Sequence, residues 1–187
     1  MMLRSVVAII LIGYPFFISA HNLVCNQLVP KVNIIDRGEL FFDNSELSYK
    51  RWDSSKFSGK VRVVQYIAGR TSAKEKNSML ITAIKNVDFP QDRFQPTTII
   101  NTDDAIPGSG FFVRSKIEKN KRHYPWAQFI VDSDGLARKA WGLPEKSSTI
   151  IVLDKNGHVK WAKDGALSPA EVDYVLNLLV QLIAKDK

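Results

Sequence analysis

Basic and hydroxyl-bearing side chains follow directly after an apolar segment, in residues 69–74 (GRTSAK). The apolar segment is rich in β-branched residues and a helical pattern comes after it, so the stretch is predicted to be a strand-to-helix turn. The first N–H groups of a helix attract anions such as phosphate or carboxylate. Arg70 and Lys74 would add positive charge, and Thr71 and Ser72 would add hydroxyl donors. The Gly-x-x-x-x-Gly-Lys-Ser/Thr spacing of a nucleotide-binding loop is absent.

The same turn has a structural interpretation, which we favour. Ser72 and Glu75 have the Ser-x-x-Glu spacing of a capping box. In such a box the serine oxygen accepts from the glutamate N–H and the glutamate reaches back to the serine N–H. The turn would then hold a helix start in place without chemistry.

Two carboxylates, Asp103 and Asp104, end the next predicted strand, residues 97–102. The carboxyl ends of strands in open α/β sheets line the crevice where ligands bind. These carboxylates are therefore expected to face Arg70 and Lys74 across one rim, together with the pair Ser147-Ser148. A carboxylate and a lysine on one rim would support general acid–base chemistry if burial shifted their pKa values. Salt bridges, or capping of the helix after Gly110, are the favoured alternative.

Metal, cofactor and thiol chemistry lack their usual residues. Cys25 is the sole cysteine, so neither an internal disulfide nor a cysteine zinc site can form. His123 and His158 have no partner at metal-ligand spacing, and Asp132-Ser133-Asp134-Gly135 lacks the later acidic ligands of a calcium loop. After processing, His21 would carry a free amine beside its imidazole, a copper chelate with no second histidine nearby. We expect no catalytic residue of these classes, no metal and no cofactor.

The elements that would position these residues alternate between strand and helix. Periodicity predicts a helix from the turn to about Asn86, and an N-cap serine, proline and glutamate at 168–171 predict another through Ile183. A hairpin is predicted around Asp36-Arg37-Gly38. The predicted strands are 31–35, 39–42, 61–67, 97–102, 128–131, 149–153 and 158–163, with a further helix over 111–121.

Three regions are predicted along the 187 residues. Residues 1–20 resemble a secretory signal peptide cleaved after about Ala20, which predicts a periplasmic protein with no stable membrane span after processing. Residues 21–60 would form an N-terminal extension with the hairpin, and 61–187 the main domain. Removal of 1–20, whose one charged residue is Arg4, leaves a net charge of +6. The positive residues are scattered, so no nucleic-acid partner is expected.

The order of elements is similar to that of thioredoxin-like proteins, over roughly residues 60–183. The phrases that carry this likeness are 61–68, 124–143 and 148–157. The whole chain further resembles the YtfJ family of small exported bacterial proteins, through 36–40 (DRGEL), 68–77 (AGRTSAKEKN), 101–110 (NTDDAIPGSG) and 161–167 (WAKDGAL). The resemblance implies an α/β fold, a thioredoxin-like three-layer sandwich with a central mixed β-sheet, here with an N-terminal β-hairpin extension. It implies no settled activity. Some family members have been labelled regulators of transcription. A signal peptide conflicts with that label, because export separates the protein from cytoplasmic DNA.

The chain departs from redox-active thioredoxin-like proteins at the turn. Thr71 and Lys74 occupy the two places of the Cys-x-x-Cys pair, and Ser147-Ser148 stands where the redox proteins keep a cis-proline. Thiol chemistry needs a thiolate nucleophile and usually a second cysteine. Thiol-disulfide oxidoreductase or thiol peroxidase activity is therefore not expected.

Three functions remain as hypotheses. The leading one is a non-redox binding or accessory module in the periplasm whose rim recognises a partner protein or a small anionic ligand. Its predicted rim residues are Arg70, Thr71, Ser72, Lys74, Asp103, Asp104, Ser147 and Ser148. The second is a non-thiol enzyme using the carboxylates with the basic residues, and the third, resting on charge alone, is a transcription regulator.

Overall fold

The computed structural model describes residues 21–185, and the predicted signal peptide lies outside them. Within this range seven strands form one mixed sheet in the order β2-β1-β5-β4-β3-β6-β7. The strands are β1 (Asn33–Asp43), β2 (Glu46–Asp53), β3 (Val61–Ala68), β4 (Phe94–Asn101), β5 (Gln128–Asp132), β6 (Ser148–Leu153) and β7 (Val159–Asp164). The helices are α1 (Thr71–Glu75), α2 (Ser78–Val87), α3 (Gly110–His123), α4 (Leu136–Trp141) and α5 (Pro169–Ala184), with a 3-10 turn at Ser54–Phe57.

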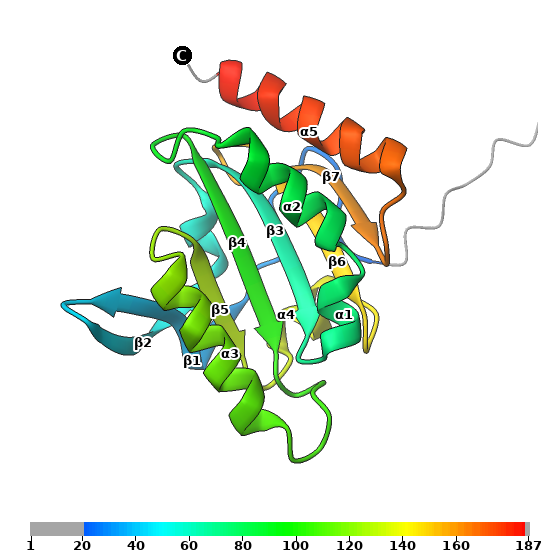
Figure 1. The fold of residues 1–187 in the computed structure, drawn as a ribbon. Coiled ribbons are helices and arrows are strands. Elements are labelled where there is room, and N and C mark those ends of the chain that lie inside the picture. Colours follow the sequence, from blue (N-terminus) through cyan, green and yellow to red (C-terminus); the bar gives the residue numbers. More distant parts are fainter. Residues whose placement is uncertain (1–20, 186–187) are drawn as a thin grey trace, which may run out of the picture.

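Helices cover both faces of this sheet (Figure 1). The parallel strands β3, β4 and β5 form its centre, and α2, α3 and α5 pack on one face through two apolar clusters. The opposite face is covered by α4 and by residues of the N-terminal extension, around the buried Trp52 and Trp141. The predicted three-layer arrangement with a mixed sheet and an N-terminal hairpin is confirmed.

The hairpin turn lies seven residues later than predicted. Strand β1 continues through Asp36-Arg37-Gly38 with an irregularity in its pairing between Ile34 and Glu39, and the chain reverses at Asn44 and Ser45, both with positive φ. Gly38 is required in the irregularity: its φ is +73°, and a Cβ there would lie 2.3 Å from the carbonyl oxygen of Lys50. The turn-like composition of residues 36–38 therefore reflects a bulge within β1, and the predicted position of the turn was wrong.

The N-terminal extension is joined to the main sheet by a buried arginine. Arg62 on β3 donates to Thr97 on the adjacent strand β4, to Gln128 on β5 beyond it, and to the carbonyl oxygens of Lys56 and Phe57. Burial lowers the pKa of its guanidinium to about 10. The extension also adds β1 and β2 to the same sheet, and its division from 61–187 stays a prediction.

The predicted start of the last helix is confirmed. Ser168 and Glu171 form a capping box, with proline at the first helical position. Glu171 also accepts from Lys163 Nζ at 2.5 and 2.6 Å. These bonds hold the pKa of its carboxyl at about 2, below its ordinary 4.5.

Acid stability should depend on this carboxylate. Because its pKa is lower in the folded than in the unfolded chain, its contribution to stability is present above about pH 4.5 and is lost as the pH falls toward 2. Glu171→Gln keeps a capping side chain but removes the charge, so its free energy of unfolding should depend less on pH across this window. Urea unfolding at a series of pH values measures this, with Asp173→Asn on the same helix as the control. An unchanged pH dependence in Glu171→Gln would contradict the assignment.

Candidate functional site

The predicted turn begins a short helix without a capping box. Helix α1 spans Thr71–Glu75, and Arg70 stands at its N-cap position with no side-chain capping bond. Ser72 is thus already inside the helix, and the predicted Ser72–Glu75 box is wrong. A helix of five residues also has too few aligned peptides to serve as an anion site by its terminus alone.

The predicted single helix after the turn is interrupted at Asn77. This side chain is buried and bridges three distant segments: its Nδ2 donates to Ser148 Oγ (3.0 Å) and Gly165 O (2.9 Å), and its Oδ1 accepts from Leu167 N (3.0 Å). It thereby anchors the start of α2 beside β6 and the segment before α5. Helix α2 packs toward α5, whereas α3 packs over β1 and β5. The sheet surface between α2 and α3 is left without a helix over it.

The predicted carboxylates do not face Lys74. Asp104 pairs with Arg70, whose Nη2 lies 3.7 Å from Oδ1 and whose Nε donates to the Asp104 carbonyl at 2.7 Å. The Asp104 carboxylate also accepts from the backbone N–H of Lys146. Asp103 is exposed and lies beside Gly135, in the loop before α4.

The predicted serines are held in structural bonds. Ser148 is fully buried against Asn77, and Ser147 accepts from Lys76 Nζ at 3.3 Å. Neither serine lines the cavity described next. Of the eight predicted rim residues, the structure brings Arg70, Thr71 and Lys74 to this cavity.

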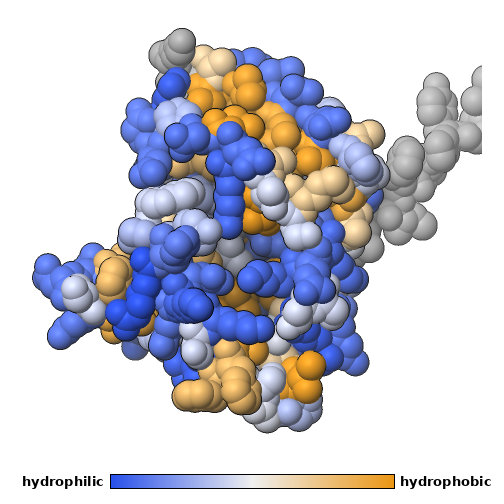
Figure 2. All heavy atoms as spheres, in the orientation of Figure 1, coloured by the Kyte–Doolittle hydropathy of each residue, from blue (hydrophilic) through white to orange (hydrophobic). Residues whose placement is uncertain are grey.

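The cavity is a groove of about 560 Å³ between α2 and α3. Figure 2 shows it as a hollow near the middle of the molecule, with hydrophilic residues around its rim. Its volume lies within the range of roughly 300–1,000 Å³ typical of small-molecule sites. Its floor is the face of β3, β4 and β5, through Val63, Gln65, Ile67, Pro96, Thr98, Ile100 and Phe129, and its helical walls include Ile81, Ile84, Val113 and Ile117.

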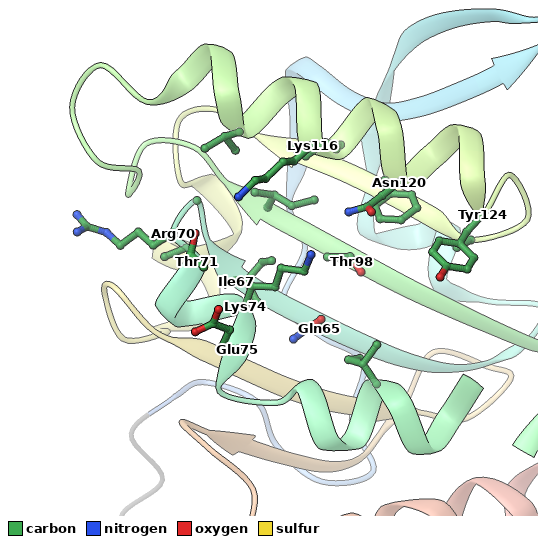
Figure 3. A pocket seen from close by; sticks show the side chains of 18 of the residues that line it. Gln65, Ile67, Arg70, Thr71, Lys74, Glu75, Thr98, Lys116, Asn120 and Tyr124 are labelled. Carbon is green, nitrogen blue, oxygen red and sulfur yellow. The ribbon is translucent and has the colours of Figure 1, made fainter. Parts of the chain in front are cut away.

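Two polar side chains lie side by side in this apolar floor. Gln65 on β3 pairs in register with Thr98 on β4. Gln65 is 5% exposed, and its Nε2 is buried without a hydrogen-bond partner among the described residues. An unpartnered buried amide is costly, by about 1–3 kcal/mol, so a hydrogen-bond acceptor that reached Nε2 from the groove would be favoured. Figure 3 shows Gln65 and Thr98 in the floor between the two helical walls.

The rim of the groove is basic at both ends. Lys74 from α1 and Lys116 from α3 stand on facing walls, and Figure 3 shows Lys74 reaching over the floor while Arg70 points away from it. Neither lysine forms an ion pair with a carboxylate of residues 21–185. At the other end Lys85 donates to Tyr124 Oη at 3.0 Å. Glu75 is the one acidic residue among those described that line the groove.

Near the groove, the residues that the structure describes offer neither a cysteine nor a metal-binding cluster. Cys25 is exposed and lies against the carbonyl of Lys160 at the start of β7. The strand register places this position at the end of the sheet opposite the turn, because β6 runs antiparallel to both β3 and β7. The described residues contain no cluster of three or more His, Cys, Asp or Glu side chains that could hold a metal.

Comparison with known proteins agrees with this architecture. The model of a family described as "Bacterial protein of unknown function (YtfJ_HI0045)" matches residues 23–182. The chain is 58% identical to "Uncharacterized protein YtfJ" of Escherichia coli (strain K12) over 183 residues, covering 98% of this chain and 100% of that one.

Solved structures support the fold at low identity. A putative protein disulfide isomerase from Bacteroides thetaiotaomicron aligns with a TM-score of 0.59 at 14% identity, covering 88% of this chain and 92% of that one. A thioredoxin-like superfamily protein aligns with a TM-score of 0.54 at 14% identity, covering 83% and 96%. The chain therefore belongs to the YtfJ_HI0045 family and has a thioredoxin-like fold.

Proposed function

We propose that the protein is a non-redox binding module whose groove between α2 and α3 takes a small amphipathic anion. The carrying observation is the placement of two lysines without ion-pair partners, Lys74 and Lys116, on facing walls above an apolar floor. The apolar body of the ligand would cover the sheet, and its carboxylate or phosphate would lie between the lysines. Periplasmic export, expected from residues 1–20, is part of this proposal.

Each part of the groove favours a different part of such a ligand. Burial of apolar surface stabilises a complex by about 25 cal/mol per Å² before the losses of association, so the floor supplies non-directional affinity. The lysines supply charge-assisted hydrogen bonds, which are stronger than neutral ones. The amide of Gln65 and the hydroxyl of Thr98 would form hydrogen bonds with a polar substituent along the body of the ligand.

The geometry favours binding over acid–base catalysis. General acid–base work needs both groups within hydrogen-bond reach of one substrate. Asp104 is engaged by Arg70 and by the Lys146 backbone, and Asp103 lies beside the loop before α4. The groove thus offers cations and apolar surface, with Glu75 as its one described carboxylate.

Titration calorimetry with three probes tests the proposal. Dodecanoate, dodecyltrimethylammonium and hexanoate, each below its micelle concentration, vary the charge at fixed chain length and the chain length at fixed charge. Dodecanoate should bind with a negative heat-capacity change, the mark of apolar burial, and more tightly than the other two. Equal affinity for the cationic probe, or no binding of dodecanoate at a millimolar concentration, would contradict the proposal.

A further inference from the structure

An exposed aromatic pair stands at the end of the groove. Phe111 and Phe112, at the start of α3, are 69% and 68% exposed, and Ile106 in the preceding loop is 54% exposed. The two rings pack edge to face with centroids 5.8 Å apart. We call Ile106, Phe111 and Phe112 the lip. In Figure 2 apolar residues gather at the lower end of the molecule, where Figure 1 places the loop between β4 and α3.

Three neighbouring features give the lip a preference for negative charge. The first turn of α3 has no side-chain cap, so its leading N–H groups lack a side-chain acceptor. Arg114 and Lys116 follow within two turns, and they share helix faces with Phe111 and Phe112 at three- and four-residue spacing. Exposed Asp103 opposes this charge, whereas Asp104 is paired with Arg70.

We propose that the lip docks on the surface of an anionic phospholipid bilayer. Its side chains would enter the boundary between headgroups and acyl chains, as aromatic and aliphatic residues of interfacial segments do. The uncapped N–H groups, Arg114 and Lys116 would meet lipid phosphates, an arrangement in which apolar and electrostatic attraction add. No helix among residues 21–185 is long and apolar enough to cross a bilayer, and the contact proposed here is peripheral.

The lip and the groove share residues but can be tested separately. Ile106 and Phe112 line the groove, whereas Phe111 does not. A bilayer contacted by the lip would therefore lie at one end of the groove. Phe111→Ser removes part of the lip and leaves every residue that lines the groove unchanged. Val180→Ser on α5, at a position 52% exposed, is the matched control for loss of an exposed apolar side chain.

Vesicle flotation of the folded chain provides the test. Protein lacking residues 1–20 is mixed with phosphatidylcholine vesicles containing about one-third phosphatidylglycerol, or with pure phosphatidylcholine. We expect binding to the anionic vesicles, weakening with salt, and a roughly tenfold loss in Phe111→Ser. Val180→Ser should bind like the unchanged protein.

Several outcomes would overturn docking on a bilayer. Failure to bind anionic vesicles would do so, as would equal binding of Phe111→Ser. Salt-sensitive self-association abolished by Phe111→Ser, without vesicle binding, would instead identify a second copy as the occupant. Dodecanoate titration of Phe111→Ser should give unchanged affinity, so failure of the lip is distinguishable from failure of the groove.

Discussion

Asn77→Ala should lower the free energy of unfolding by about 2–4 kcal/mol, because a buried side chain with three hydrogen bonds is lost. The carbonyl of Gly165 and the N–H of Leu167 would remain in place without their partner. Leaving a buried group unsatisfied costs about 1–3 kcal/mol, which makes the loss larger than that of the bonds alone. Alanine also leaves a small void beneath the start of α2.

Urea unfolding measures this effect, and Asn86→Ala is the matched control. Asn86 lies on the same helix but is exposed, so its loss should stay within about 0.5 kcal/mol. Asn77→Asp provides a second comparison, because a carboxylate could still accept from Leu167 but could not donate to Gly165. It should be at least as destabilising as alanine. A loss for Asn77→Ala no larger than for Asn86→Ala would refute the anchoring role.

Reversing the charge of both groove lysines, Lys74 and Lys116, should abolish measurable binding of dodecanoate. A hydrogen bond to a charged group contributes about 1.5–3 kcal/mol, so removal of either lysine should weaken binding roughly 10–100-fold. Lys74→Met and Lys116→Met keep the apolar stems and test the charges singly. The double variant Lys74→Glu, Lys116→Glu adds repulsion of the anionic head to this loss.

The control for charge reversal lies on the same helix. Lys119 on α3 is exposed and does not line the groove. Lys119→Glu changes the net charge of the protein by the same amount as either single reversal, so it reports any long-range effect of charge. Its affinity for dodecanoate should remain within a factor of about two at physiological salt, where exposed charges are largely screened. Equal weakening by Lys119→Glu and by Lys116→Glu would argue against a defined head-group site.

The sheet and its layers could be predicted from the sequence because they follow from local patterns. Apolar runs predicted the central strands, and Ser168 with Glu171 marked the start of α5 correctly. The same spacing at Ser72 and Glu75 gave a wrong prediction. It is compatible with a capping box but does not fix which residue starts the helix. The break at Asn77 depends on partners 71 to 90 residues away in sequence. Local periodicity cannot reveal such a contact.

The groove was missed for a related reason. Its walls are apolar residues at helical spacing, which resemble ordinary core positions. The groove lies beside α2, whose start Asn77 anchors to β6 and to the segment before α5. One sequence signal was available: Gln65 and Thr98 interrupt two apolar strands at positions that face the same side. Because they lie in register on neighbouring strands, they form a polar pair within an otherwise apolar floor.

For the two carboxylates the position was predicted from the sequence, but the direction of the side chains was not. Asp103 and Asp104 were correctly expected beyond the end of β4, but the rim they were to share with Lys74 requires side-chain directions that sequence does not specify. Asp104 turns toward Arg70 and the Lys146 backbone. Of the two structural roles favoured from the sequence, the salt bridge agrees with this pairing, whereas neither carboxylate caps α3.

The proposed ligand site is the groove between α2 and α3. Amide chemical shifts of ¹⁵N-labelled protein, recorded during titration with dodecanoate, test its location most directly. We expect saturable shifts at Gln65, Ile67 and Thr98 in the floor and at Val113 and Lys116 on α3. Residues around Trp52 and Trp141, on the other face of the sheet, should not change. Saturable shifts confined to that other face, with the floor residues unmoved, would contradict the account.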